Sequence, residues 1–304
     1  MSVTTTRRSS GPRGFGGRSV DGSSLSAFVP VIAVLPMSFL ALFVFWLPVH
    51  AIWSISLGWF VAGYVAAGVL LFLRPVQAFV LMPLLGAHRP TPDERAVIDV
   101  AWRSVLQANG LPAKRYVIGV LPADELNAFA CGGHLVIVTS FAISELPRDE
   151  LSGVLAHELS HHLGFHTVAL TIGHWLSAPV LLLARIGFFL HSVATAATES
   201  FARNSASFTA IGRIAAALLT AGSWVFLSGL LVTNALANAM GRNTEFEADQ
   251  RAVDMGFGRP LASALRRFLP YEERPSNWRQ RLAATHPSAR TRIARIEAHG
   301  RRSR

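Results

Sequence analysis

The sequence is poor in cysteine and in charged residues. Its one cysteine, Cys131, excludes an intrachain disulfide framework and any cysteine-rich zinc or iron–sulfur site. Charged residues make up 15% of the 304 positions, against about 25% in an ordinary soluble protein, while hydrophobic residues reach 51%. This composition excludes a disordered chain and disfavours an ordinary soluble domain. The net charge of +10 further requires that apolar and basic residues occupy different segments.

The longest segment without charge is Leu25–Leu73, which lacks Asp, Glu, Lys and Arg. As one helix it would be roughly 73 Å long, more than twice the ~30 Å hydrocarbon core of a bilayer. Pro48 offers a break, so we expect two membrane-spanning helices, at about 26–47 and 51–73, joined by a tight turn. A cleavable signal peptide is disfavoured, because its apolar core would have only about 7–15 residues.

Two more apolar segments occur in the second half of the chain. One covers 167–190 and contains Pro179 and Arg185, and the other covers 214–240 without any charge. We expect both to cross the membrane as a hairpin, although a long buried helix is an alternative for the first. The sequence therefore predicts four spans.

The arginines indicate the orientation of these spans. Four arginines precede the first span, and residues 242–304 contain 14 Arg against 7 acidic residues. By the positive-inside rule, both termini face the cytoplasm of a multi-pass protein in the cell membrane. The basic charge therefore indicates topology and contact with the lipid bilayer. No recognition helix, zinc finger or aromatic–basic pattern supports nucleic-acid binding.

The segments between the spans suggest one water-exposed domain in two parts. Thr91-Pro92-Asp93-Glu94 is typical of a helix start, and a second helix is expected to begin near Pro147. Between them lie three short strand-like runs, Tyr116–Leu121, Asn127–Cys131 and Leu135–Thr139. We divide the chain into a disordered basic N-terminus (1–24), a two-span hairpin (25–73), a first domain part (74–166), a second hairpin (167–241), and a second domain part with a basic tail (242–304).

The helix after Pro147 carries His157-Glu158-Leu159-Ser160-His161. Residues four apart share a helical face, so His157 and His161 can bind one metal ion together. Imidazole pairs suit Zn²⁺, which lowers the pKa of a bound water, and a carboxylate beside that water can act as a general base. Glu158 is rotated by about 100° from His157 and fits the role of the base. Chance would produce such a pattern roughly 0.01 times in a chain of this composition.

Catalytic zinc needs a third protein ligand. Just after the fourth span, Glu245 and Asp249 lie four residues apart on one expected helical face, whereas Glu247 points away. This spacing suits one carboxylate on the metal and a second one that orients a ligand histidine. The alternative is a solvated acidic patch beside Arg242 and Arg251.

Several of these motifs together resemble the HtpX-type membrane zinc metalloproteases, bacterial relatives of the CAAX prenyl endopeptidases. The matching segments are Asn127–Ala130, Val136–Thr139, Asp149–Leu151, Val154–His161, Glu245–Asp249 and His286-Pro287. The resemblance implies a mostly α fold: a four-span helical membrane protein with a cytoplasmic zincin-like (gluzincin) α+β metalloprotease domain that contains a small sheet. It also implies one Zn²⁺ per chain held by His157, His161 and Glu245, with Glu158 catalytic and Asp249 supporting a ligand histidine.

The resemblance assigns weaker roles to other residues. Asn127, Ala128, Phe129 and Ala130 resemble an edge strand to which an extended polypeptide substrate adds by main-chain hydrogen bonds. His286 and Arg292 resemble groups that stabilise the oxyanion of the tetrahedral intermediate. A His-Pro turn with a solvated arginine is the alternative for that pair. By contrast, His162 and His166 are interpreted as polar residues near the membrane surface.

We therefore expect an integral-membrane zinc endopeptidase that cleaves misfolded or regulated membrane proteins at the cytoplasmic face. A catalytically silent membrane interaction protein of the same fold, or a CAAX-type processing protease, is the alternative. An intramembrane protease is disfavoured, because Asp149 and Glu150 place the start of the metal-binding helix in water. A sensor–transducer is disfavoured because no second ligand-binding domain is evident. The oligomeric state is left open.

Overall fold

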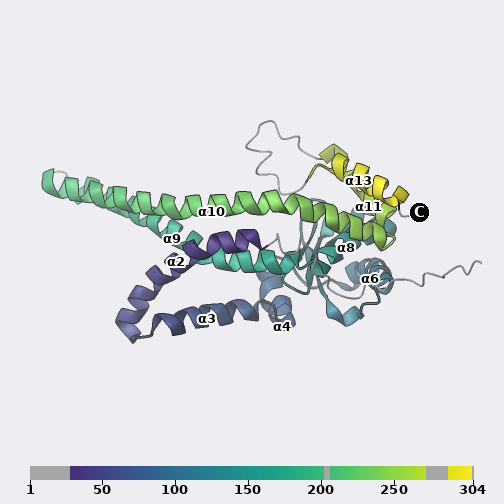
Figure 1. The fold of residues 1–304 in the computed structure, drawn as a ribbon, viewed down its shortest axis with the longest axis horizontal. Coiled ribbons are helices and arrows are strands. Elements are labelled where there is room, and N and C mark those ends of the chain that lie inside the picture. Colours follow the sequence, from purple (N-terminus) through teal and green to yellow (C-terminus); the bar gives the residue numbers. More distant parts are fainter. Residues whose placement is uncertain (1–27, 202–205, 272–286, 303–304) are drawn as a thin grey trace, which may run out of the picture.

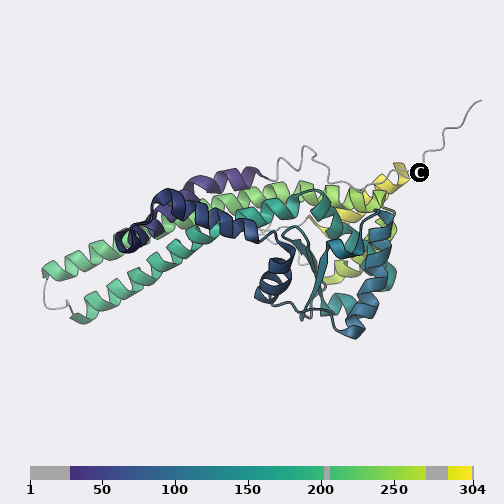
Figure 2. The ribbon, with the colours of Figure 1, turned by 90° about the horizontal axis from the view of Figure 1, so that it is seen from below.

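The structure is a computed structural model that describes residues 28–201, 206–271 and 287–302. Three of its helices are long and apolar enough to cross a membrane: α2 (Val29–Trp53), α9 (His166–Phe201) and α10 (Ala206–Asp254). Helices α9 and α10 form an antiparallel hairpin against which α2 packs (Figure 1). Figure 2 shows this hairpin projecting from the domain that holds the sheet. The expected segment 1–24 and His286 lie outside the described residues.

The remaining membrane segment is bent. Helix α3 (Leu57–Leu70) has 14 residues and is about 21 Å long, shorter than the ~30 Å hydrocarbon core. It is followed by a short helical segment made of α4 (Arg74–Val76), the π-helical turn η1 (Gln77–Leu81) and α5 (Met82–Leu84). The two parts meet at 75°, so the described chain has three candidate spans, or four if the bent pair counts as one.

The positions of the turns differ from those expected. The first turn is not at Pro48, which lies inside α2, but at 54–56. There Ser54 takes a left-handed conformation with φ 54°, and the Ser56 hydroxyl caps α3. Proline removes one helical hydrogen bond, which a long apolar helix tolerates in lipid, whereas a left-handed residue stops the helix. Residues 191–208, which follow the third predicted span, are also helical over most of their described part, because α9 and α10 both extend into them.

A three-stranded sheet forms one side of the soluble part. Strand β3 (Leu135–Thr139) lies in the middle, parallel to β1 (Val117–Leu121) and antiparallel to β2 (Ala128–Cys131). In register, Val117 pairs with Leu135 and Ala128 with Val138. All five residues of β3 are buried, and β1 and β2 form the sheet edges. The three strands occupy the runs predicted from sequence.

Helices cover the sheet and build the core. Helix α6 (Pro92–Ala108) starts with a complete capping box between Thr91 and Glu94, and α7 (Ser140–Glu145) leads into α8 (Arg148–Leu163). Helix α8 lies in the centre, with Leu151, Leu155, Ala156 and Leu159 fully buried. Helices α11 (Gly258–Phe268) and α13 (Ala289–Arg302) pack on its other side together with α10. Two short 3-10 turns, Ala113–Arg115 and Leu269–Tyr271, complete the described elements.

Candidate metal centre

The two histidines of the motif on α8 point toward one another. The Nε2 atoms of His157 and His161 are 3.3 Å apart, which follows from their placement one turn apart on the same face of α8. His157 is 5% exposed, so its imidazole is removed from bulk water. The local sequence alone therefore brings two nitrogen donors to one point.

The third donor comes from α10. One carboxylate oxygen of Glu245 lies 3.4 Å from His157 Nε2, and the other lies 3.4 Å from His161 Nε2. The ligand atoms of these three residues all lie within 4.8 Å of one another. The predicted boundary at 242 lies within α10, which runs unbroken from the membrane hairpin past this carboxylate. A rigid helix thus carries Glu245 from the hairpin to the face of α8.

This set of donors fits a tetrahedral zinc ion. At Zn–N and Zn–O distances of about 2.0–2.2 Å, neighbouring tetrahedral ligand atoms lie about 3.3–3.6 Å apart. The separation of the two imidazole Nε2 atoms, 3.3 Å, agrees with that value, and each Nε2 atom lies 3.4 Å from one of the two oxygens of Glu245. Two imidazoles and one carboxylate also leave a fourth position, which is the usual arrangement of catalytic zinc.

Asp249 lies one turn after Glu245 and orients His157. Its Oδ1 atom is 3.0 Å from the Nδ1 of His157, so Nδ1–H can donate while Nε2 points toward His161 and Glu245. Burial and the neighbouring Arg292 oppose protonation of His157, but its hydrogen bonds to Asp249 and Glu245 raise the pKa of His157 from 6.5 to about 9. The two carboxylates thus favour a positive charge at this imidazole, whether from a proton or from a metal ion.

Arg292 of α13 joins the same cluster. Its Nε and Nη2 donate to the two carboxylate oxygens of Asp249, at 2.9 and 2.7 Å, and its Nη1 lies 3.2 Å from Glu245. The side chain is buried, and burial disfavours its charge, but the bonds to Asp249 outweigh this effect and raise the pKa of Arg292. Arg292 is therefore not a solvated surface arginine, and one guanidinium links both carboxylates.

Glu158 belongs to the same environment. It is buried on α8 directly after His157 and is one of the carboxylates whose charge raises the pKa of Arg292, against the effect of burial. Asp149 on α8 and Asp254 on α10 are exposed, and neither belongs to the cluster. The structure thus separates the buried acids of the motif from those on the surface.

Two further histidines lie close to the motif on α8. His162 and His166, predicted to be polar residues near the membrane surface, are both buried inside the protein. His162 Nε2 lies 3.1 Å from the carbonyl oxygen of Leu135 on β3, which ties α8 to the sheet. His166 Nδ1 lies 3.4 Å from His161 Nδ1, on the side of that imidazole away from His157 and Glu245. The sequence around these two histidines contains no pattern that predicts either contact.

The expected substrate strand forms the free edge of the sheet. Asn127 is exposed and directly precedes β2, and its carbonyl accepts a hydrogen bond from the Thr139 amide at 3.0 Å. Hydrogen-bonded and non-bonded pairs alternate along antiparallel strands. The backbone groups of Ala128 and Ala130 therefore point away from β3, whereas those of Phe129 point toward it. Among the described strands, none pairs with the outer side of β2.

The chain is similar to known proteases over most of its length. The model of peptidase family M48 matches residues 92–299. A protease HtpX homolog of Acidiphilium cryptum (strain JF-5) is 28% identical over 214 residues, which cover 62% of this chain and 68% of the relative. A second homolog, from Gemmatimonas aurantiaca, is 28% identical over 203 residues, covering 66% of each chain. The match thus spans about two thirds of the length of these relatives.

The fold also resembles a solved structure. The crystal structure of S. mikatae Ste24p matches with a TM-score of 0.51 at 16% identity, and the match covers 93% of this chain and 68% of that one. At this identity the similarity concerns the fold alone. It agrees with the predicted mostly helical membrane protein with a small sheet. Since the family model spans α6, the sheet, the metal-site helix α8, the membrane hairpin and most of α13, the chain belongs to peptidase family M48.

Proposed function

We propose that this protein is an integral-membrane zinc endopeptidase that hydrolyses peptide bonds of misfolded or regulated membrane proteins. The observation that carries the proposal is the convergence of His157, His161 and Glu245 at donor separations suited to zinc. Family membership and the membrane helices support the same conclusion. When bound there, a zinc ion would supply an acidified water and polarise the scissile carbonyl.

The side chains of this site have distinct tasks in the proposed reaction. The Glu158 carboxylate takes a proton from the attacking water and delivers it to the nitrogen of the leaving amine. Asp249 keeps the imidazole of His157 in the tautomer that directs Nε2 toward the metal position. Arg292, which lies beside Glu245, is proposed to stabilise negative charge on the reacting carbonyl oxygen, together with His286.

The free edge of β2 supports binding of an extended polypeptide. Because the backbone groups of Ala128 and Ala130 point outward, a substrate strand can form main-chain hydrogen bonds with them. Such bonds do not depend on the substrate's side chains, which suits an enzyme that acts on many unfolded segments. We propose that Asn127 at the start of this edge fixes the register of the substrate.

We also propose that the catalytic site faces the cytoplasm and that residues 74–166 and 242–304 form one catalytic domain around it. The basic residues before the first span and after the fourth support this orientation, because such residues favour the cytoplasmic side. A cysteine introduced at the exposed Gln107 should react with a membrane-impermeant maleimide only after inner-membrane vesicles are inverted. Labelling in intact spheroplasts would contradict the proposed orientation.

The substitution Glu158→Gln tests the proposed chemistry. It should lower the rate of cleavage of an unfolded membrane-protein substrate by at least about 100-fold, because it removes the general base. It should leave bound zinc unchanged, since Glu158 is not a ligand. Asp149→Asn, an exposed acid on the same helix, serves as the matched control and should keep full activity.

Two alternatives have distinct outcomes. A catalytically silent membrane scaffold would show neither bound metal nor cleavage in the wild-type protein purified without chelators. A CAAX-type processing protease would cleave a prenylated C-terminal peptide in preference to the same peptide without the prenyl group. The proposed enzyme should cleave both peptides at similar rates.

A further inference from the structure

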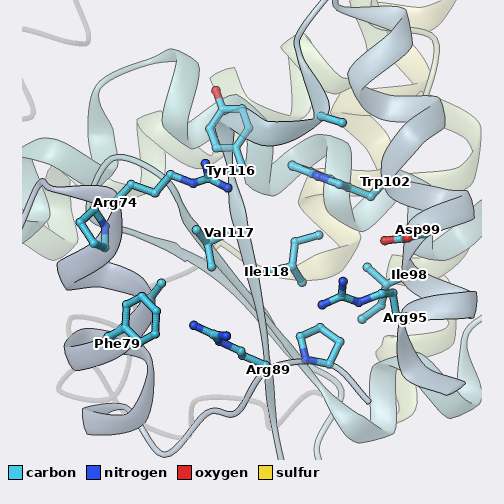
Figure 3. Close-up of a pocket in the computed structure, with 14 residues that line it drawn as sticks. Arg74, Phe79, Arg89, Arg95, Ile98, Asp99, Trp102, Tyr116, Val117 and Ile118 are labelled. Carbon is cyan, nitrogen blue, oxygen red and sulfur yellow. The ribbon is translucent and has the colours of Figure 1, made fainter. Parts of the chain in front are cut away.

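A cavity lies at the edge of the sheet opposite β2, beside β1. It has a volume of about 540 Å³ and lies between the α4–η1 segment, the start of α6 and the outer side of β1. Figure 3 shows Arg74, Phe79 and Arg89 on one side and Arg95 on the other, with Val117 and Ile118 of β1 between them. None of its lining residues belongs to the cluster around His157, so it is separate from the proposed catalytic site.

The charge of this cavity is unbalanced. Arg74, Arg89 and Arg95 line it, and within the described residues none of them forms an ion pair with a carboxylate. The acid in the lining, Asp99, lies 3.5 Å from Arg103, which is outside the cavity. Three positive charges thus face one acid that already has a partner. The three arginines are exposed, and they come from three separate chain segments to line one cavity without a carboxylate partner among the described residues, so this arrangement favours an anion from outside the chain.

One of these arginines, Arg89, is held beside an aromatic ring. The guanidinium of Arg89 lies over the ring of Phe79, 4.5 Å from its centroid, which limits its motion and leaves its N–H edges free. Guanidinium groups bind phosphate oxygens with paired N–H donors, more specifically than a lysine ammonium does. The cavity is large enough for a phosphate headgroup, because small-ligand pockets measure about 300–1,000 Å³.

The chain around the cavity indicates where the anion comes from. The α4–α5 segment turns by 75° from α3, directly after the last residues of that apolar helix. It exposes Phe79, Val80 and Leu84 at 67%, 54% and 76%, while Gln77 and Met82 are buried against the domain. A short helix with one exposed apolar face beside a membrane span is typical of a segment lying in the membrane interface. The cavity therefore opens at the level of lipid headgroups.

We propose that this cavity binds the phosphate headgroup of an anionic phospholipid in the leaflet next to the soluble domain. The lipid's acyl chains lie beside Phe79, Val80 and Leu84, and its phosphate lies among Arg74, Arg89 and Arg95. Such a site anchors the soluble domain to the membrane surface. The proposal depends on the membrane helices and not on the proposed peptidase activity.

Native mass spectrometry of the full-length protein in detergent tests this site. The probe is an equimolar mixture of phosphatidylglycerol and phosphatidylcholine with identical acyl chains. The wild-type protein should retain phosphatidylglycerol in preference, and the variant R74Q/R89Q/R95Q should lose at least about tenfold of this selectivity. The matched control R259Q/R301Q/R302Q removes equal charge from exposed positions on α11 and α13 and should select the lipid as the wild type does.

Three outcomes would overturn the proposal. One is unchanged lipid selectivity in R74Q/R89Q/R95Q, and another is an equal loss in the control, which would indicate only general charge attraction. The third is displacement of the lipid by millimolar inorganic phosphate or glycerol phosphate, which would show a site for water-soluble phosphates. The single variant R95Q, exposed on α6, repeats the test if the triple variant fails to bind zinc or unfolds, and it should lose part of the selectivity.

Discussion

The Nδ1 of His157 lies 3.0 Å from the Oδ1 of Asp249, although most of the membrane hairpin lies between these two residues in the sequence. A carboxylate in this position fixes the imidazole tautomer and increases its basicity toward a metal. Asp249→Asn should therefore lower zinc affinity by about 10–100-fold while leaving the three ligands in place. Competition with a zinc chelator measures this change.

The control for that experiment is Asp254→Asn on the same helix. Asp254 pairs with His299 on the surface and contacts no metal-site residue. The zinc affinity of the Asp254→Asn variant should equal that of the wild type. Equal affinities in the Asp249 and Asp254 variants would contradict the proposed role of Asp249.

Arg292→Leu should destabilise the metal-free protein by about 3–5 kcal/mol, because Asp249 and Glu245 would lose their buried counter-charge. Zinc supplies positive charge at the same place, so the loss should be smaller when zinc is bound. Denaturant unfolding with and without EDTA, followed by circular dichroism, measures both values. Arg290→Leu, an exposed position on α13, should change neither. An equal loss with and without zinc would show that packing, and not charge, explains the effect.

The contact between α8 and α11 should depend on pH. Glu150 accepts hydrogen bonds from Arg267 at 2.9 Å and from Ser263 at 2.8 Å. The Arg267 bond lowers the pKa of Glu150, against the effect of burial and with help from Ser263. A lowered folded-state pKa gives stability that is fully present above the unfolded value of about 4.3 and is lost as the pH falls through the folded value.

Glu150→Gln should therefore melt at a lower temperature than the wild type at pH 7, and the two should converge in acid below pH 4. Thermal unfolding in detergent at several pH values gives the difference at each point. A difference that stays constant down to the lowest pH would show that the charge of Glu150 is not its cause. Asp149→Asn, next in sequence but exposed, should match the wild type throughout.

Gly153 allows α8 and α11 to pack closely. A Cβ at this position would lie 2.7 Å from the carbonyl carbon of Pro260 and closer still to the amide of Leu261. Backbone atoms do not yield as a flexible side chain would, so Gly153→Ala should cost about 1–3 kcal/mol in folding free energy. It should also reduce zinc occupancy, because His157 lies one turn further on α8.

Gly63→Ala in α3 is the matched control, since nothing lies within 4 Å of the added methyl group. Denaturant midpoints and bound zinc per chain compare the two variants. Normal zinc content and stability in Gly153→Ala would contradict the close packing of these helices.

Several features of the fold and of the metal site could be predicted, because they depend on residues close together in the chain. Apolar runs of sufficient length specify the membrane helices, short strand-like runs bounded by turn residues specify the strands, and a four-residue spacing places His157 and His161 on one face of α8. The turn at 54–56 was missed, since a proline inside an apolar helix resembles a stop in sequence. The burial of His162 was missed as well, because its partner lies on β3.

The membrane helices and the two-histidine metal motif can be read from the sequence, because both follow from local composition and helical period. The bridge of Arg292 between Asp249 and Glu245, and the shared cavity of Arg74, Arg89 and Arg95, become visible in the folded molecule alone. These groups come from segments far apart in the chain, and their distances depend on how the helices pack. Local patterns contain no information about such packing, so charges that look like separate surface residues in sequence meet only in the folded molecule.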